Sequence, residues 1–532
     1  MKRFTSMLIA IDQTTSTSTK TELIAQYLQE ESLEKNKLWT IALFTGKKPQ
    51  RTVNTTLLRK WCAAEANIPL WLFEHNYHII GDLAETISLI LPEYNITHTS
   101  KSMSEWIEEM IALKNAEEEE KQIFIINAWK SMDRPSIWVF NKLVTGGFRV
   151  GVAKNIIIKA LSMVTSQDST KIAYHLTGNW TPLKTTWSEL FNFQDVTSDH
   201  SKPFPFYLAH ALPNEIISDI NPQRWVAEWK WDGIRGQLIK RKGEIYLWSR
   251  GEELITDKFP EFQCLANMPD DFVLDGEIVA WKMEKPMDFQ KLQTRIGRKN
   301  PGKKIMSDIP VKFIAYDLLE VNGVDIRLKS FEERRLLLEK IYESCIGGVL
   351  KLSPLIHFES IETLKEVRNE SKQYQAEGLM IKRKTGVYHS GRKTGDMWKW
   401  KVDPFTIDAV LIYAQRGHGR RANLFSDFTF ALWDGDRLLP FAKAYSGLSD
   451  NEMKEITTFV RNNTIETFGP VSSVQPLLVF ELAFEGISFS TRHKSGIAVR
   501  FPRISRWRKD KNPDEADTLN HIKELLCDTE QF

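Results

Sequence analysis

Lys230 stands in the segment Glu228-Trp-Lys230-Trp-Asp-Gly-Ile-Arg235, which is the strongest chemical signal in this chain. The pattern predicts a strand that carries the lysine to a tight turn at Asp232-Gly233, with an arginine shortly after. A lysine beside tryptophans loses water, and neighbouring cations disfavour its charged form. Both effects lower the pKa of an amine and make it a nucleophile. The simpler alternative is an amphipathic strand with an exposed lysine, and this segment alone does not decide between the two.

Two glutamates and two further lysines offer charged groups that could act beside such a nucleophile. Lys399 and Lys401 alternate on a predicted strand, so both ammonium groups are expected to face phosphate from one side. Glu277 and Glu377 lie on separate predicted strands, and carboxylate oxygens suit a hard cation such as Mg²⁺. Taken singly, each of these residues is explained more simply as part of a solvated strand. The chain has no Gly-x-x-x-x-Gly-Lys-Ser/Thr loop, which excludes binding of ATP in the P-loop manner.

Considered together, these motifs resemble those of the covalent nucleotidyltransferases. Within that superfamily they resemble the ATP-dependent DNA ligases, most closely the bacterial three-domain type. The matching segments follow in the order typical of the family: Glu228 to Arg235, Ser249 to Glu252, Asp275 to Glu277, Phe313 to Leu319, Glu377 to Lys382, Trp398 to Lys401 and Arg508 to Lys511. The resemblance implies that Lys230 is the lysine that becomes covalently adenylated.

The resemblance also implies roles for the residues that would surround the nucleotide. Glu228 reads the adenine amino group, and Tyr316 stacks on adenine, where many relatives carry Phe. Arg235 lies near the ribose and the DNA 5′-phosphate, and Arg250 lies close to the nucleotide and the same phosphate. The full set of implied nucleotide-binding residues is Glu228, Arg235, Arg250, Glu277, Tyr316, Lys399, Lys401, Arg508 and Lys511.

By the same resemblance, Glu277 and Glu377 hold the metal ion, Mg²⁺ or Mn²⁺. The motif from Arg508 to Lys511 orients the pyrophosphate that leaves ATP. This motif ends a dense basic run: Arg492, Lys494, Arg500, Arg503, Arg506, Arg508, Lys509 and Lys511. Such a run can serve DNA phosphates as well as the triphosphate. The apolar residues interleaved with it disfavour the alternative of a solvated basic tail.

A glycine-rich segment, Leu143 to Ala153, favours DNA as the substrate. It resembles the turn of ligase DNA-binding domains. Glycines there, Gly147 and Gly151, let backbone amides approach phosphates, and Arg149 adds charge. A plain turn between two helices explains the same residues equally well when they are considered alone.

The pattern of the chain changes twice, which predicts three domains. Residues 1–203 are expected to form an all-α DNA-binding domain, with a capping box at Thr19 to Glu22 and a long helix from Ser102 to Lys121. Pro203-Phe-Pro205 is a predicted linker. Residues 204–403 are expected to form an α+β adenylation domain, with strands over 225–229, 234–240, 245–249, 272–281, 311–319 and 378–383. Residues 404–532 alternate short strands with turns, which predicts a C-terminal OB-fold β-barrel.

The composition is compatible with this division. A chain of 532 residues is too long for one core, and 42% hydrophobic with 26% charged residues is typical of a globular protein. A net charge of +2 excludes a uniformly basic nucleic-acid coat. Four scattered cysteines indicate neither a zinc site nor a disulfide framework, and no apolar run reaches the length of a membrane span. We therefore expect a cytoplasmic monomer with no membrane association.

These observations predict an ATP-dependent DNA ligase that seals nicks in double-stranded DNA. AMP would pass from Lys230 to the 5′-phosphate before the 3′-hydroxyl attacks. An RNA ligase or a capping-type nucleotidyltransferase is the nearest alternative, and the helical N-terminal region disfavours it. An NAD-dependent ligase is disfavoured because the cysteines form no zinc motif. A non-catalytic DNA-binding scaffold need not retain so many charges that are costly to bury. The sequence does not identify protein partners.

Overall fold

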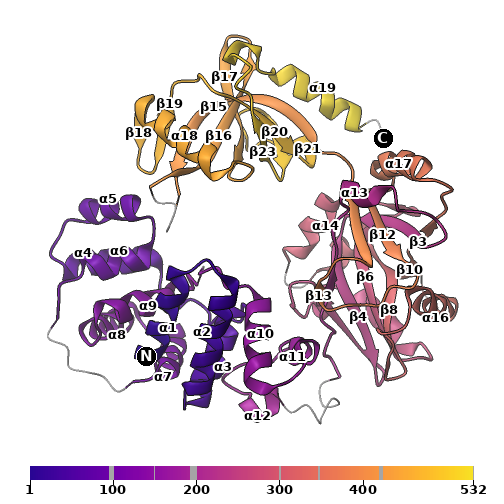
Figure 1. The fold of residues 1–532 in the computed structure, drawn as a ribbon, viewed down its shortest axis with the longest axis horizontal. Coiled ribbons are helices and arrows are strands. Elements are labelled where there is room, and N and C mark those ends of the chain that lie inside the picture. Colours follow the sequence, from indigo (N-terminus) through magenta and orange to yellow (C-terminus); the bar gives the residue numbers. More distant parts are fainter. Residues whose placement is uncertain are drawn as a thin grey trace. The chain divides into compact units, whose positions relative to one another are not determined.

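The computed structural model describes residues 1–94, 101–148, 150–191, 200–298, 301–345, 348–417 and 423–530. Contacts divide the chain into two compact units. Figure 1 shows the helices and strands of both, coloured along the sequence. One unit comprises Met1–Ala153 together with Asp403–Phe532, and the other comprises Lys154–Val402. The second unit contains Lys230 and the glutamates and lysines predicted to surround it.

The N-terminal stretch is helical, as predicted. Its helices are α1 (Lys2–Gln13), α2 (Thr17–Glu30), α3 (Glu34–Phe44), α4 (Thr55–Glu65), α5 (Leu70–Ile80), α6 (Leu83–Ile90), α7 (Met103–Ala112), α8 (Glu118–Lys130) and α9 (Arg134–Thr145). Aromatic and aliphatic side chains from distant helices, such as Phe4, Ile41 and Trp129, are buried. The predicted capping box at Thr19 is wrong, because α2 begins at Thr17 and its N-cap is Ser16, which accepts a hydrogen bond from the Thr19 N–H.

The predicted helix from Ser102 to Lys121 is also wrong in its extent. Ser102 does cap a helix, but α7 ends at Ala112 and a short 3-10 turn follows. Helix α8 then begins at Glu118 with three glutamates in its first turn. Negative charge is favourable at a helix N-terminus because the backbone N–H groups point toward it. These three glutamates therefore begin α8 and do not lie at the end of one long helix from Ser102.

The second unit begins with helices α10 (Lys154–Thr165), α11 (Ser169–His175) and α12 (Trp187–Leu190). Two sheets follow. The first has the order β10-β8-β6-β4-β5, with bounds Leu350–Leu352, Val311–Val321, Phe272–Lys282, Ile234–Arg241 and Glu244–Ser249. The second has the order β11-β3-β12-β14-β2, with bounds Leu355–Ile356, Trp225–Trp231, Ala376–Arg383, Met397–Lys401 and His210–Ala211. All predicted strands of this region are confirmed to within two residues at each end.

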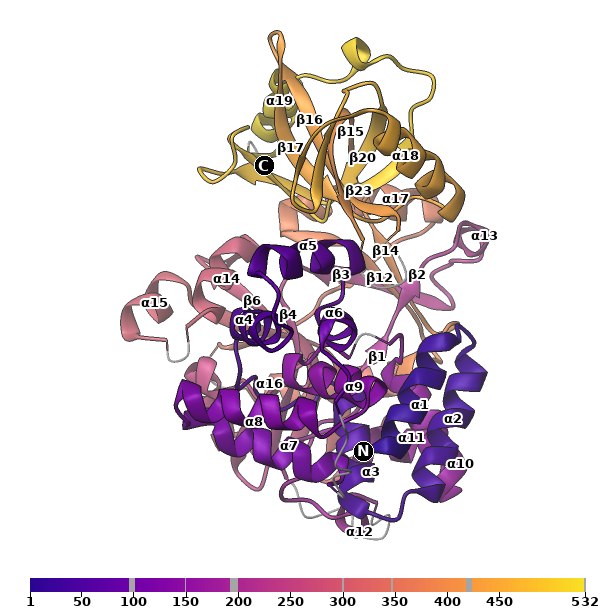
Figure 2. The same cartoon turned by 90° about the vertical axis from the view of Figure 1, so that its left-hand side faces the viewer.

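The two sheets pack against each other. One buried cluster joins Trp229 of β3 and Leu379 of β12 to Val279 of β6 and Ile314 of β8. The other face of the first sheet packs on helices α14 (Phe289–Ile296) and α16 (Phe331–Glu343). Strands β3, β12 and β14 lie side by side (Figure 2), so residues far apart in the sequence meet on neighbouring strands.

The C-terminal stretch is a strongly curled antiparallel sheet with two added helices. Strand β15 (Phe405–Arg416) pairs with β20 (Val479–Phe484) along its first half and with β19 (Val471–Val474) along its second. Strands β16 (Phe425–Asp434) and β17 (Arg437–Ala444) continue the sheet on the other side, and β23 (Arg503–Trp507) pairs with β20. One long strand that pairs with two successive partners along the same edge makes the sheet curl. This arrangement is consistent with the predicted OB fold.

Candidate active site

Lys230 lies on β3 between two buried tryptophans, Trp229 and Trp231. Side chains alternate along a strand, so the tryptophans enter the core while the lysine turns away from it. Its side chain is 22% exposed. The lysine is therefore held on a rigid central strand and remains accessible, as a nucleophile must be.

Glu377 is the nearest charged partner of Lys230. Its Oε2 atom forms an ion pair with Lys230 Nζ and lies 3.3 Å from Lys401 Nζ. A bulge in β12 gives Glu377 this position, because the pairing with β3 shifts between Ala376 and Leu379. Gly378 in the bulge has φ +136°, and a Cβ there would clash with the Trp400 carbonyl oxygen. Only glycine fits both requirements.

The crowding of cations that the sequence predicts for Lys230 is found around Lys399, which belongs to the same group of charges. Burial lowers the pKa of Lys399, and the charges of Lys401, Lys230, Arg392 and Arg250 lower it further. Lys399 and Lys401 both project from β14, as predicted. A surface with this much positive charge attracts phosphate. Arg392 had no role in the sequence prediction, and only its position six residues before the predicted strand at Trp398 pointed to it.

Glu277, on β6, is half-buried beside the same group of charges. Burial raises its pKa to about 8, and the charges of Asp275 and Glu377 contribute, while Lys230 and Arg235 oppose the rise. Glu277 and Glu377 therefore influence each other, although they come from different sheets. Two carboxylates beside a cluster of cations fit Mg²⁺, which binds proteins through one or two carboxylates and completes its shell with water and substrate phosphates. Within the described residues, no cluster of three or more His, Cys, Asp or Glu side chains would hold a metal by itself.

Glu228 is almost completely buried, with 1% of its side chain exposed. Lys382 Nζ donates to its Oε2 at 3.0 Å, and Arg335 Nη1 lies 3.6 Å from its Oε1. In the part of the chain that is described, no hydrogen bond reaches Oε1. The ammonium of Lys382 also lies over the Tyr316 ring, 4.9 Å from its centroid. Sequence reasoning missed Arg335, because a buried arginine on an amphipathic helix carries no motif.

Arg235 lies opposite Glu277 in the pairing of β4 with β6. Its Nη2 and Nε atoms donate to the two oxygens of Asp275 at 2.7 and 3.1 Å. Arg250 is next to it in space, since the Arg250 N–H donates to the Arg235 carbonyl oxygen. The structure thus brings together Lys230, Glu277, Glu377, Lys399, Lys401, Arg235 and Arg250.

Arg508 and Lys511 lie in the other compact unit, where both pair with Asp408 of β15 at 2.7 and 2.6 Å. Other members of the basic run are paired as well: Arg503 with Glu485, Arg506 with Glu481, and Lys509 with Glu455. Much of the positive charge of this run is therefore balanced within its own domain. The pairs of Arg506 and Lys509 are exposed and contribute about 0–1 kcal/mol, so phosphate can exchange with them at little cost.

The glycine-rich segment connects α9 to α10. Gly146 ends α9 in the left-handed conformation at φ +67°, which accounts for this glycine by helix termination alone. Gly151 has φ +65°, and the buried Lys20 Nζ donates to the carbonyl oxygens of Val150 and Gly151 at 2.7 and 3.3 Å. Gly147 donates its N–H to the Lys142 carbonyl oxygen. Arg149, predicted to contact DNA, lies outside the described residues.

Comparison with known proteins adds independent support. Residues 207–401 match the family "ATP dependent DNA ligase domain", residues 1–162 match "DNA ligase N terminus", and residues 421–511 match "ATP dependent DNA ligase C terminal region". A DNA ligase of Nanoarchaeum equitans is 30% identical over 413 residues, covering 72% of this chain and 71% of that relative. The chain belongs to the ATP-dependent DNA ligases. Its predicted activity as an ATP-dependent DNA ligase is thereby confirmed.

Further relatives span nearly the whole ligase. A probable DNA ligase of Koribacter versatilis is 29% identical and covers 97% of this chain and 95% of its own. DNA ligase 2 of Methanosarcina acetivorans is 28% identical, with coverage of 98% and 97%. A solved structure described as "Pmar-Lig_Pre" has a TM-score of 0.62 over 95% of the ligase and 99% of that chain, and at 15% identity it supports the fold alone. No described helix of the ligase has both the length and the apolar character needed to cross a membrane.

Proposed function

We propose that the ligase seals nicks in double-stranded DNA as a monomer, through an adenylate carried covalently on Lys230. The observation that supports this assignment is the grouping of Lys230, Glu377 and Lys401 at the end of three neighbouring strands. A nucleophile, a carboxylate and a phosphate-binding cation are the groups that the first chemical step needs.

In the first step, the Lys230 amine attacks the α-phosphorus of ATP. A bond from Nζ to phosphorus forms, and the bond to the β-phosphate oxygen breaks, so pyrophosphate leaves. An ammonium has no lone pair, so Lys230 must first lose a proton. Glu377, in direct ion-pair contact, is placed to receive it. Lys399 and Lys401 balance the negative charge of the phosphates during the transfer.

In the second step, a 5′-phosphate oxygen of the nick attacks the same phosphorus, and the bond to Lys230 breaks. In the third step, the 3′-hydroxyl attacks the 5′-phosphate. The phosphodiester bond forms, and AMP leaves. Arg235 and Arg250, adjacent through a backbone hydrogen bond, would bind the 5′-phosphate in both steps. Glu228 would bind the amino group of adenine, and the Tyr316 ring would stack on the base.

Glu277 and Glu377 would hold Mg²⁺ or Mn²⁺, which supplies positive charge to the phosphates. Glu277→Gln replaces a carboxyl group that would ionise on binding the metal, so it should weaken binding of Mn²⁺ with ATP at least tenfold, a loss of about 1.4 kcal/mol. Water-proton relaxation measures that binding without any turnover. The matched control is Glu284→Gln, a glutamate that pairs with Lys312 and Lys351 at the surface. Equal Mn²⁺ affinity in both variants would contradict the metal role.

The helical region would bind the duplex around the nick. A chain that begins at Lys154, the start of the second unit, should still form the lysyl adenylate but bind and seal nicked DNA poorly. The slope of log affinity against log salt should also become less steep, by about 0.9 for each lost phosphate contact. In the full chain, Arg149→Ala alone should reduce the slope by about one. Unchanged sealing and an unchanged slope in the shortened chain would mean that these helices do not bind DNA.

A further inference from the structure

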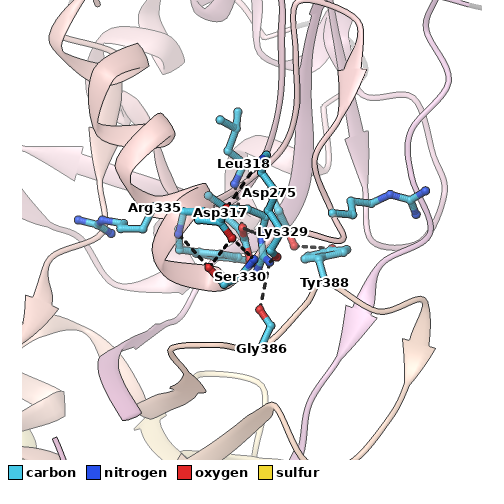
Figure 3. Close-up of polar contacts among 12 residues, drawn as sticks. Asp275, Asp317, Leu318, Lys329, Ser330, Arg335, Gly386 and Tyr388 are labelled. Carbon is cyan, nitrogen blue, oxygen red and sulfur yellow. Dashed lines mark hydrogen bonds and ion pairs between the residues drawn. The ribbon is translucent and has the colours of Figure 1, made fainter. Parts of the chain in front are cut away.

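The Asp275 carboxylate is fully buried, yet the structure gives it three hydrogen bonds. Two come from the Arg235 guanidinium, and the third comes from the hydroxyl of Tyr388 at 2.6 Å. Figure 3 shows the Tyr388 side chain directed at Asp275. A buried carboxylate is stable only when its oxygens are paired and hydrogen-bonded. The Tyr388 hydroxyl therefore adds a third hydrogen bond to the two that Arg235 donates to Asp275.

Tyr388 is held in place from several sides. Its side chain is buried, and its backbone N–H donates to the Arg327 carbonyl oxygen. Its ring meets the Tyr207 ring edge-on with centroids 5.9 Å apart, and its hydroxyl oxygen accepts the Tyr207 N–H at 3.2 Å. Burial raises the pKa of Tyr388 well above its ordinary value, so the hydroxyl keeps the proton that it donates.

The orientation of Arg235 depends on Asp275. Both oxygens of Asp275 are engaged by the planar guanidinium, which fixes the plane of the arginine. The guanidinium also lies 5.3 Å from the centroid of the Phe206 ring and 5.8 Å from that of Tyr316. Its side chain is 17% exposed, so one edge remains accessible. A rotation of the Asp275 carboxylate would turn that accessible edge with it.

We propose that Tyr388 is a positioning residue for transfer of the adenylate to DNA: its hydroxyl holds Asp275, and through Asp275 it orients Arg235 toward the 5′-phosphate. The proposal rests on the role given to Arg235 under the proposed function. Tyr388 itself contacts neither the nucleotide nor the nick in this scheme. A hydrogen bond to a charged group that sets the geometry of the reacting groups affects rate beyond its effect on stability.

A double-mutant cycle tests the proposal in the full-length ligase. The enzyme is loaded with AMP, freed of ATP, and mixed with nicked DNA, and the single-turnover rate of DNA-adenylate formation is measured. Tyr388→Phe keeps the ring and removes only the hydroxyl, and it should slow this rate about tenfold. In an Arg235→Lys background, which keeps the charge but loses the planar fork, Tyr388→Phe should slow the rate less than about twofold, because the two residues act as one unit.

Tyr207→Phe is the matched control. Tyr207 is the equally buried ring partner of Tyr388, and its hydroxyl donates to the Lys393 carbonyl oxygen at 3.5 Å rather than to Asp275. This variant should leave the transfer rate unchanged in both backgrounds. A tenfold loss from Tyr388→Phe in both backgrounds would show a merely structural role. It would overturn this inference and leave the proposed role of Arg235 unaffected. If Arg235→Lys by itself transferred AMP at the normal rate, the proposed role of Arg235 would fall and the inference with it.

Discussion

Lys230→Ala should abolish labelling of the ligase by ATP that carries radioactive phosphorus at the α-position, a loss of at least about 1,000-fold. The reason is that the variant lacks the atom to which AMP becomes bound, and no positioning of the remaining groups replaces a nucleophile. The label on the unaltered ligase should be released by acid and resist base, as a phosphoramidate does. Gel electrophoresis followed by autoradiography measures both.

The control for this change is Lys351→Ala, a lysine of the same unit that pairs with the exposed Glu284 on the first sheet. It should label normally. The Lys230→Ala protein should also still close a nick whose 5′-phosphate has been adenylated chemically, because that step no longer involves the lysine as nucleophile. Undiminished labelling of Lys230→Ala would remove the covalent mechanism proposed above.

The double change Arg508→Ala and Lys511→Ala should slow self-adenylation from ATP at least about 100-fold, the usual effect of removing groups that stabilise developing charge. A cation placed against a leaving group matters only in the step in which that group departs. Closing of a pre-adenylated nick releases no pyrophosphate, so it should be spared far more. The two rates are measured separately for each variant.

Two further variants sharpen this comparison. Arg506→Ala with Lys509→Ala removes the same charge from neighbouring positions whose ion pairs are exposed, and it should affect self-adenylation only slightly. Lys401→Ala should damage both reactions, because Lys401 lies beside Glu377 at the predicted phosphate site throughout. Equal losses in both rates for the Arg508 and Lys511 variant would show that this motif acts by holding DNA instead.

The strands around Lys230 were predictable because their signals are local. Alternating tryptophans define β3, and the turns at its end define where the chain reverses. The break between α7 and α8 was not predictable in the same way. Residues on both sides favour helix, and the division depends on how each helix packs in the finished domain.

The charged partners were harder to predict than the strands. Lys230 was expected among cations, but its direct contact is Glu377, which a bulge in a strand 147 residues later brings to it. The basic run near the C-terminus was expected to be available to phosphates, yet Asp408 and several glutamates already pair with it. Periodicity shows which face of a strand is polar. It does not show which distant side chain lies opposite, and tertiary pairing decides that.

The buried Oε1 atom of Glu228, which within the described residues accepts no hydrogen bond, bears on how the ligase selects among nucleotides. If this atom faces the exocyclic edge of the base, adenine offers an N–H donor there, whereas guanine offers a carbonyl oxygen. GTP would place two acceptors against each other and leave both without donors, which costs more than the absence of a contact. Discrimination would then come mainly from exclusion of the wrong base rather than from tighter binding of the right one. Sites that depend on such a mismatch of polarity reject wrong substrates far more strongly than sites that depend on shape alone.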